Sequence, residues 1–186
     1  MGYDDGVGGI ERWVAEARAA DAVDSRVRER WLRTQAAESS TWAGVLITLA
    51  EAATPVVVTT SAGRRHAGLV VTVGDDFVAV RRAGERVTVI SIAAVASVKP
   101  SGPARATPVG GERHPSSSAP VTLLGVLERA VGDRPRLMLA AGDTQVTGQL
   151  LAVGVDVVTV RTDAHPPGLA YVSLASISEA SLLDSG

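Results

Sequence analysis

GLVVTVGDDFVAVRR, residues 68–82, and GQLLAVGVDVVTVRT, residues 148–162, repeat one pattern within a chain of 186 residues. In each stretch, β-branched residues alternate with other types on both sides of a Gly-containing turn, which is typical of an antiparallel hairpin. Identical residues recur 80 positions apart, and most of those shared are Gly and Val. We therefore predict one hairpin that occurs twice in an internally repeated chain.

The residues around each hairpin extend the repeat. Short β-branched runs continue on both sides of residues 68–82 and 148–162, separated by turns rich in Gly and charged residues. A short apolar segment of helix-forming residues precedes each set of runs. Each copy is thus predicted to contain a short helix followed by five strands, and the fold class is α+β, mainly β.

Composition divides the chain into four segments. Residues 1–40 are rich in helix formers, with apolar residues at spacings of three and four, which predicts an N-terminal helical segment. Residues 100–120 are rich in Pro, Gly and Ser, which predicts a flexible linker. The two copies occupy residues 41–99 and 121–186.

This order of elements resembles the Sm-like (LSm) small β-barrel, in which a helix precedes a strongly bent five-stranded sheet. The resemblance covers residues 42–98 and 121–182 and rests on strand order and on the glycine and apolar pattern. It implies N-terminal helices followed by two Sm-like five-stranded antiparallel barrels, each preceded by a short helix.

The same resemblance implies an RNA site formed by an Asp, an apolar residue and an Asn after the second strand. Asp75 and Phe77 match this pattern, but Val78 stands where the family has Asn. The corresponding residues of the second copy are Val155, Val157 and Val158. The basic residue that the family carries near the fourth and fifth strands is also missing. Without the amide and the cation, we do not expect the family's uridine site here.

Six basic residues lie in two predicted turns of the first copy: Arg64, Arg65, His66, Arg81, Arg82 and Arg86. The first and third turns of an antiparallel meander lie at the same end of the sheet, so these residues are candidates for one nucleic-acid-binding rim. The first copy carries a net charge of +2 and the second −3, so only the first suits phosphate. Solvated arginines that discourage edge pairing are the alternative interpretation.

Three tryptophans are candidates for docking or self-association: Trp13, Trp31 and Trp42. They lie at helical spacing with other apolar residues, so they are expected to pack helices on a barrel or on another subunit. A ligand cage is the less favoured alternative.

The sequence offers no set of catalytic or metal-binding residues. There is no cysteine, and the three histidines, at positions 66, 114 and 165, lack the spacing of metal ligands. The GDD at residues 74–76 is a turn sequence, since its counterpart is GVD. We therefore expect no metal, no cofactor, no small-molecule substrate and no enzymatic activity.

Composition also limits the setting and the partners. The formal net charge of −2 is nearly neutral, the first residues lack the apolar region of a secretory signal, and no apolar run is long enough to span a membrane. The basic residues are almost all Arg, which is typical of a GC-rich bacterial genome, as in actinobacteria. We expect a cytoplasmic, non-enzymatic interaction or scaffold protein that binds a protein partner or itself. The alternative is a regulator that binds RNA or DNA through the basic rim.

Overall fold

The computed structural model describes residues 41–84, 86–101 and 121–183. The predicted N-terminal helical segment with Trp13 and Trp31, and nearly all of the predicted linker, lie outside these residues. The first half contains α2 (Trp42–Glu51), β1 (Pro55–Thr60), β2 (Arg65–Val73), β3 (Phe77–Arg81), β4 (Val87–Ser91), η1 (Ile92–Ala94) and β5 (Val95–Pro100).

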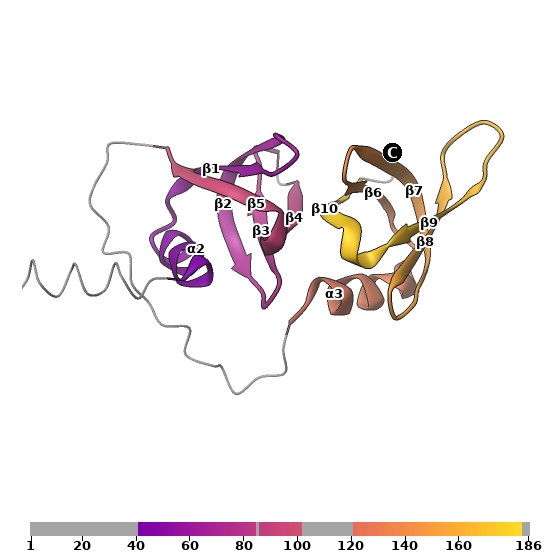
Figure 1. Cartoon of the computed structure of the whole chain (residues 1–186), viewed down its shortest axis with the longest axis horizontal. Helices are drawn as coiled ribbons and strands as arrows, with labels where there is room; N and C mark the ends of the chain where they lie inside the picture. The colour runs from indigo at the N-terminus through magenta and orange to yellow at the C-terminus, as the bar shows by residue number, and fades with distance from the viewer. Residues whose placement is uncertain (1–40, 85, 102–120, 184–186) are drawn as a thin grey trace, which may run out of the picture.

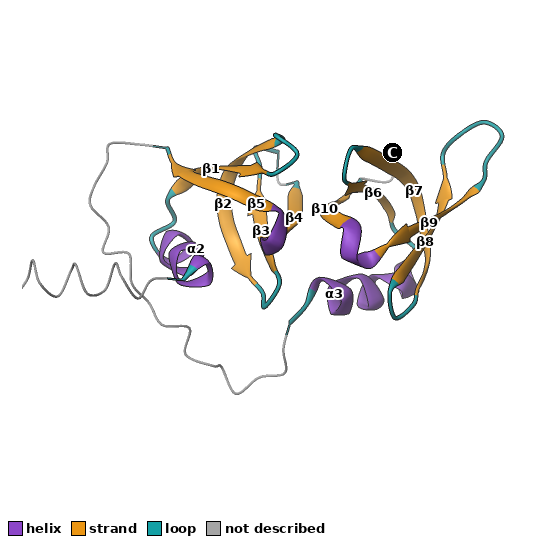
Figure 2. Cartoon of the chain, in the orientation of Figure 1, coloured by secondary structure: helices purple, strands orange, loops and turns teal. Residues whose placement is uncertain are grey.

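The second half repeats this order. It contains α3 (Leu123–Ala130), η2 (Val131–Asp133), β6 (Arg136–Ala141), β7 (Thr144–Val153), β8 (Val157–Thr162), β9 (Leu169–Ser173), η3 (Leu174–Ser176) and β10 (Ile177–Leu182). A single 3-10 turn stands before the fifth strand of each half, as Figure 2 shows. The predicted short helix before five strands is therefore present in both halves.

The ten strands of the described residues belong to one antiparallel sheet, with the order β5-β1-β2-β3-β4-β10-β6-β7-β8-β9 (Figure 1). The expectation of two separate Sm-like barrels is wrong, because β4 of the first half pairs with β10 of the second. An isolated five-stranded sheet would leave hydrogen-bonding groups unpaired at both edges. Here one edge of each half pairs with the other half, so the sheet continues across the junction.

The two matching stretches form the predicted hairpins, β2–β3 and β7–β8. Gly68 and Gly148 allow the paired strands to approach closely, because a Cβ at either position would lie 2.0 Å from a backbone carbonyl oxygen of the opposite strand. The GDD at residues 74–76 forms the turn of the first hairpin, as predicted. The repeated glycines are therefore required by backbone packing.

Each helix begins at a threonine whose hydroxyl oxygen accepts a hydrogen bond from a backbone N–H in the first turn. Thr41 accepts from Gly44, and Thr122 accepts from Gly125, both at 3.1 Å. The helices cover the apolar side of their own halves, α2 through Leu46 and Leu49 and α3 through Leu123 and Leu127. Thr41 and Thr122 thus act as equivalent helix caps in the two halves.

The cores of the two halves meet at the junction. Leu46, Val58 and Ile90 belong to the cluster of the first half. The cluster of the second half also includes Phe77 and Ala79 from β3 of the first half. Apolar burial therefore continues across the junction, as the hydrogen bonds of the sheet do.

Candidate functional site

The junction between the halves is the most elaborate polar contact among the described residues. Its strands pair in register, with Glu179 opposite Ile90, Ala180 opposite Val89 and Ser181 opposite Thr88. The Ser181 hydroxyl donates to Thr88 Oγ1 at 3.0 Å. The contact joins the fourth strand of one half to the fifth strand of the other, so it uses two different edges.

A buried carboxylate lies at the centre of this junction. Glu179 on β10 is 1% exposed, and Arg64, from the turn before β2, donates from Nε to Glu179 Oε1 at 2.7 Å. Arg64 Nη2 also donates to Ser178 Oγ at 3.0 Å and to the Gly142 carbonyl oxygen at 3.3 Å. One guanidinium of the first half therefore binds three groups of the second.

His66 completes the cluster. Its Nε2 lies 3.2 Å from Glu179 Oε2 and its side chain is almost fully buried, although neither ring nitrogen makes a hydrogen bond of standard geometry to a described residue. Burial by itself would raise the pKa of Glu179. The interactions with His66 and Arg64 outweigh burial, so the pKa of Glu179 lies below its ordinary value. The carboxylate is therefore ionised at neutral pH.

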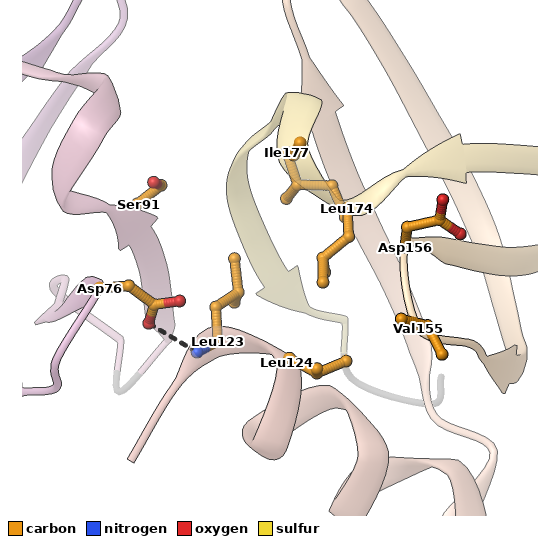
Figure 3. Close-up of a pocket in the computed structure, with 9 residues that line it drawn as sticks. Asp76, Ser91, Leu123, Leu124, Val155, Asp156, Leu174 and Ile177 are labelled. Atoms are coloured by element: carbon orange, nitrogen blue, oxygen red, sulfur yellow. Dashed lines mark hydrogen bonds between the residues drawn. The ribbon is translucent and has the colours of Figure 1, made fainter. Parts of the chain in front are cut away.

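The first hairpin makes a second contact across the junction. Asp76 Oδ1 accepts a hydrogen bond from the Leu123 N–H at 2.8 Å, at the start of α3 (Figure 3). The Asp75 N–H donates to the Val121 carbonyl oxygen at 2.9 Å. The GDD turn thus holds the N-terminus of the helix of the other half.

An open hollow of about 300 Å³ lies beside this contact. Asp76 and Ser91 line it from the first half, and Leu123, Val155 and Asp156 line it from the second (Figure 3). Two aspartates therefore face a mainly apolar hollow. No group of three His, Asp or Glu side chains that could hold a metal ion is found in the described part of the chain.

Among the described residues, the sheet ends at two strands that pair on one side only, β5 and β9. Exposed apolar side chains lie near the free edge of β9: Leu169 and Tyr171 on the strand itself, and Val155 in the turn before β8. Tyr171 is 70% exposed. Trp42, the described member of the predicted docking set, is 45% exposed at the start of α2.

The six basic residues of the predicted rim have different surroundings. Arg64 and His66 are engaged at the junction. The exposed members are Arg65, Arg81, Arg82 and Arg86. The sequence analysis missed Glu179, although one signal marked it: the strand ISEAS carries a carboxylate where the first copy has Ser97.

No family model matches the chain, and no curated protein is significantly similar to it. The resemblance to the Sm-like family therefore stays a prediction. None of the described helices has the length and apolar character needed to cross a membrane.

Proposed function

We propose that this chain is a non-enzymatic interaction protein that associates with further copies of itself through β5 and β9. The observation that carries the proposal is the strand order. The internal junction joins a fourth strand, β4, to a fifth strand, β10. Within the described part of the chain, the edges without a second partner are the remaining fourth strand, β9, and the remaining fifth strand, β5. A contact between two different surfaces can repeat head to tail when both surfaces recur at the ends.

The exposed apolar residues support this proposal. Val87 and Val89 on β4 are partly buried against the core of the second half. Their counterparts on β9, 82 residues further on, are the exposed Leu169 and Tyr171. A second copy on β9 would cover these two side chains as the second half covers the valines.

The residues of the contact between Asp76 and the start of α3 have counterparts as well. Asp156 corresponds to Asp76, and Trp42 follows a capping threonine as Leu123 does. Leu123 is 5% exposed and Trp42 is 45% exposed. In the proposed contact the N-terminus of α2 would meet Asp156 of a second copy, which would bury Trp42. The docking role predicted for Trp42 and the cytoplasmic location predicted for the chain belong to the same proposal.

Equivalence of the strands also gives the register. The pairs Ser181–Thr88 and Glu179–Ile90 correspond to Lys99–Ala170 and Ser97–Val172 of a second copy. Because the chain has no cysteine, engineered cysteines are specific reporters of pairing. The pair Ala170→Cys with Lys99→Cys should form disulfides between chains and give a ladder of covalent oligomers on non-reducing gels.

Two control pairs complete this experiment. Thr88→Cys with Ser181→Cys should form a disulfide within one chain without changing its mass. Ala170→Cys with Val98→Cys should give little covalent oligomer, because side chains of adjacent strand residues point to opposite faces. A monomer at high concentration and no ladder from the first pair would contradict the proposal.

Nucleic-acid binding is the alternative function of the chain. It now rests on the exposed Arg65, Arg81, Arg82 and Arg86, since Arg64 and His66 are engaged with Glu179. Salt-sensitive RNA or DNA binding by a chain that stays monomeric would favour this alternative.

A further inference from the structure

In the proposed assembly, the junction within one chain and the junction between two copies have the same geometry. Each strand edge could therefore also pair with the wrong strand. If the proposed self-association takes place, β4 of one copy could accept β5 of another copy in place of its own β10. We infer that the ion pair between Arg64 and Glu179, together with His66, selects β10 as the partner of β4. This inference rests on the proposed function and names the residues that give it specificity.

One strand contributes the carboxylate, and the other half contributes the Arg64 guanidinium and the neighbouring His66 ring. Glu179 on β10 is 1% exposed, whereas Arg64 and His66 belong to the half that contains β4. Removing one partner from a buried ion pair leaves a charge without compensation, which is strongly unfavourable. Glu179 is the deeply buried member of the pair, whereas the Arg64 side chain is 24% exposed, so a strand beside β4 without an acceptor costs Arg64 its charge-assisted hydrogen bonds.

β5 does not supply this acceptor. The residue of β5 that corresponds to Glu179 is Ser97, because Ser97 pairs with Thr59 of β1 as Glu179 pairs with Ala140 of β6. Ser178, whose hydroxyl accepts from Arg64, corresponds to Ala96. With β5 beside β4, Arg64 would face a serine and an alanine, and its charge would lose its partner.

The opposite mismatch leaves the more deeply buried charge without its partner. The second half has Thr144 and Val146 where the first half has Arg64 and His66. With β10 of another copy beside β9, Glu179 would face these two neutral side chains and remain a buried, unpaired carboxylate. The charged pairing of β4 with β10 and the neutral pairing of β9 with β5 are therefore the two matched combinations.

Engineered cysteines distinguish the correct pairing from the wrong one. The pair Thr88→Cys with Lys99→Cys reports β4 of one copy beside β5 of another. In the otherwise native chain we expect about tenfold less interchain disulfide from this pair than from Ala170→Cys with Lys99→Cys, because β5 beside β4 would deprive Arg64 of the acceptors Glu179 and Ser178.

Two sets of substitutions then alter the charges. The first, Arg64→Thr with His66→Val and Glu179→Ser, gives the junction the residues of its neutral counterpart and should raise the Thr88–Lys99 disulfide about tenfold. The second, Glu179→Ser with Ser97→Glu, moves the carboxylate to β5 and should make this disulfide the dominant product. Circular dichroism establishes that each variant is folded.

The results separate this inference from the proposed function. Self-association fails when the Ala170–Lys99 pair gives no interchain disulfide in the native background. The inference that charge selects the partner of β4 is contradicted when both sets of substitutions leave the yield of the Thr88–Lys99 disulfide at its native level. Should the neutral triple variant unfold, the variant with the transferred carboxylate still decides, since it retains Arg64, His66 and one glutamate.

Discussion

Glu179 is the side chain on which the junction depends most, because it is charged and almost inaccessible to water. Arg64 compensates that charge from the other half of the chain, and His66 Nε2 lies beside the second carboxylate oxygen. A buried carboxylate is tolerated in a protein interior when cations and hydrogen-bond donors surround it. The cluster therefore couples the stability of each half to the presence of the other.

Replacing Glu179 should destabilise the protein strongly at neutral pH. Glu179→Gln leaves Arg64 without its counter-charge, and we expect a loss of about 3 kcal/mol in the free energy of unfolding. Asp163→Asn is the matched control, because the Arg136–Asp163 ion pair is exposed and such pairs contribute about 0–1 kcal/mol. Urea denaturation at pH 7 measures both, and equal effects would contradict the assigned importance of the junction.

The same carboxylate makes stability depend on pH. Its pKa is lower in the folded protein than in the unfolded chain, so its contribution is complete above the unfolded value of about 4.3 and is lost as the pH falls through the folded value. Melting temperatures measured from pH 7 down to pH 3 should fall more steeply for the native chain than for Glu179→Gln. Parallel curves would exclude this linkage.

Gly148 illustrates a different constraint, the space between paired strands. A Cβ at this position would lie 2.0 Å from the Arg161 carbonyl oxygen, so the backbones must separate to accommodate it. We expect Gly148→Ala to cost about 1–3 kcal/mol in the free energy of unfolding. Gly132→Ala is the control, since a Cβ there meets nothing within 4 Å, and its effect should stay within about 0.5 kcal/mol.

Among the elements, α3 depends most clearly on a contact with the other half. Its own threonine caps one N–H at the N-terminus, and Asp76 from the first hairpin binds another. The sequence indicated a turn at GDD, and the structure adds that one of its aspartates binds a helix 47 residues further along the chain. Hairpin and helix are thus fixed relative to each other.

The two equivalent aspartates should respond differently to substitution. Asp76→Ala removes a hydrogen bond to the start of α3 and should lower the free energy of unfolding by about 0.5–2 kcal/mol. Asp156→Ala should leave that quantity within about 0.5 kcal/mol, because Asp156 is exposed, but should weaken association of the native chain. Thermal unfolding and sedimentation measure the two effects. Equal destabilisation by both variants would argue against the proposed equivalence.

At the scale of the molecule, the described residues form two similar halves that share one sheet and bury apolar residues across their junction. Repetition of one unit with a contact between unlike edges leaves one edge of each kind free. Exposed apolar side chains lie on β9, including Tyr171, and Trp42 is exposed at the start of α2 of the other half. These features make a head-to-tail assembly the arrangement that best accounts for the molecule.

The sequence was sufficient to predict the repeat, the paired hairpins and the short helix before each set of strands. These features depend on neighbours close in the chain: alternation of residue types, helix-forming residues, and turn-forming Gly and Asp. The candidate site was less accessible, because Arg64 and His66 looked like surface cations and Glu179 lies 115 residues from Arg64.

Only the tertiary structure shows which strand edges pair with each other. Backbone N–H and C=O groups are the same at every strand edge, so the alternation pattern does not reveal whether β4 pairs with β10 or each half closes into a barrel. The choice follows from contacts between distant residues: the ion pair of Arg64 with Glu179, the Asp76 contact with α3 and the shared core. Local chemistry thus defined the strands, and long-range burial of charge and apolar surface defined how they join.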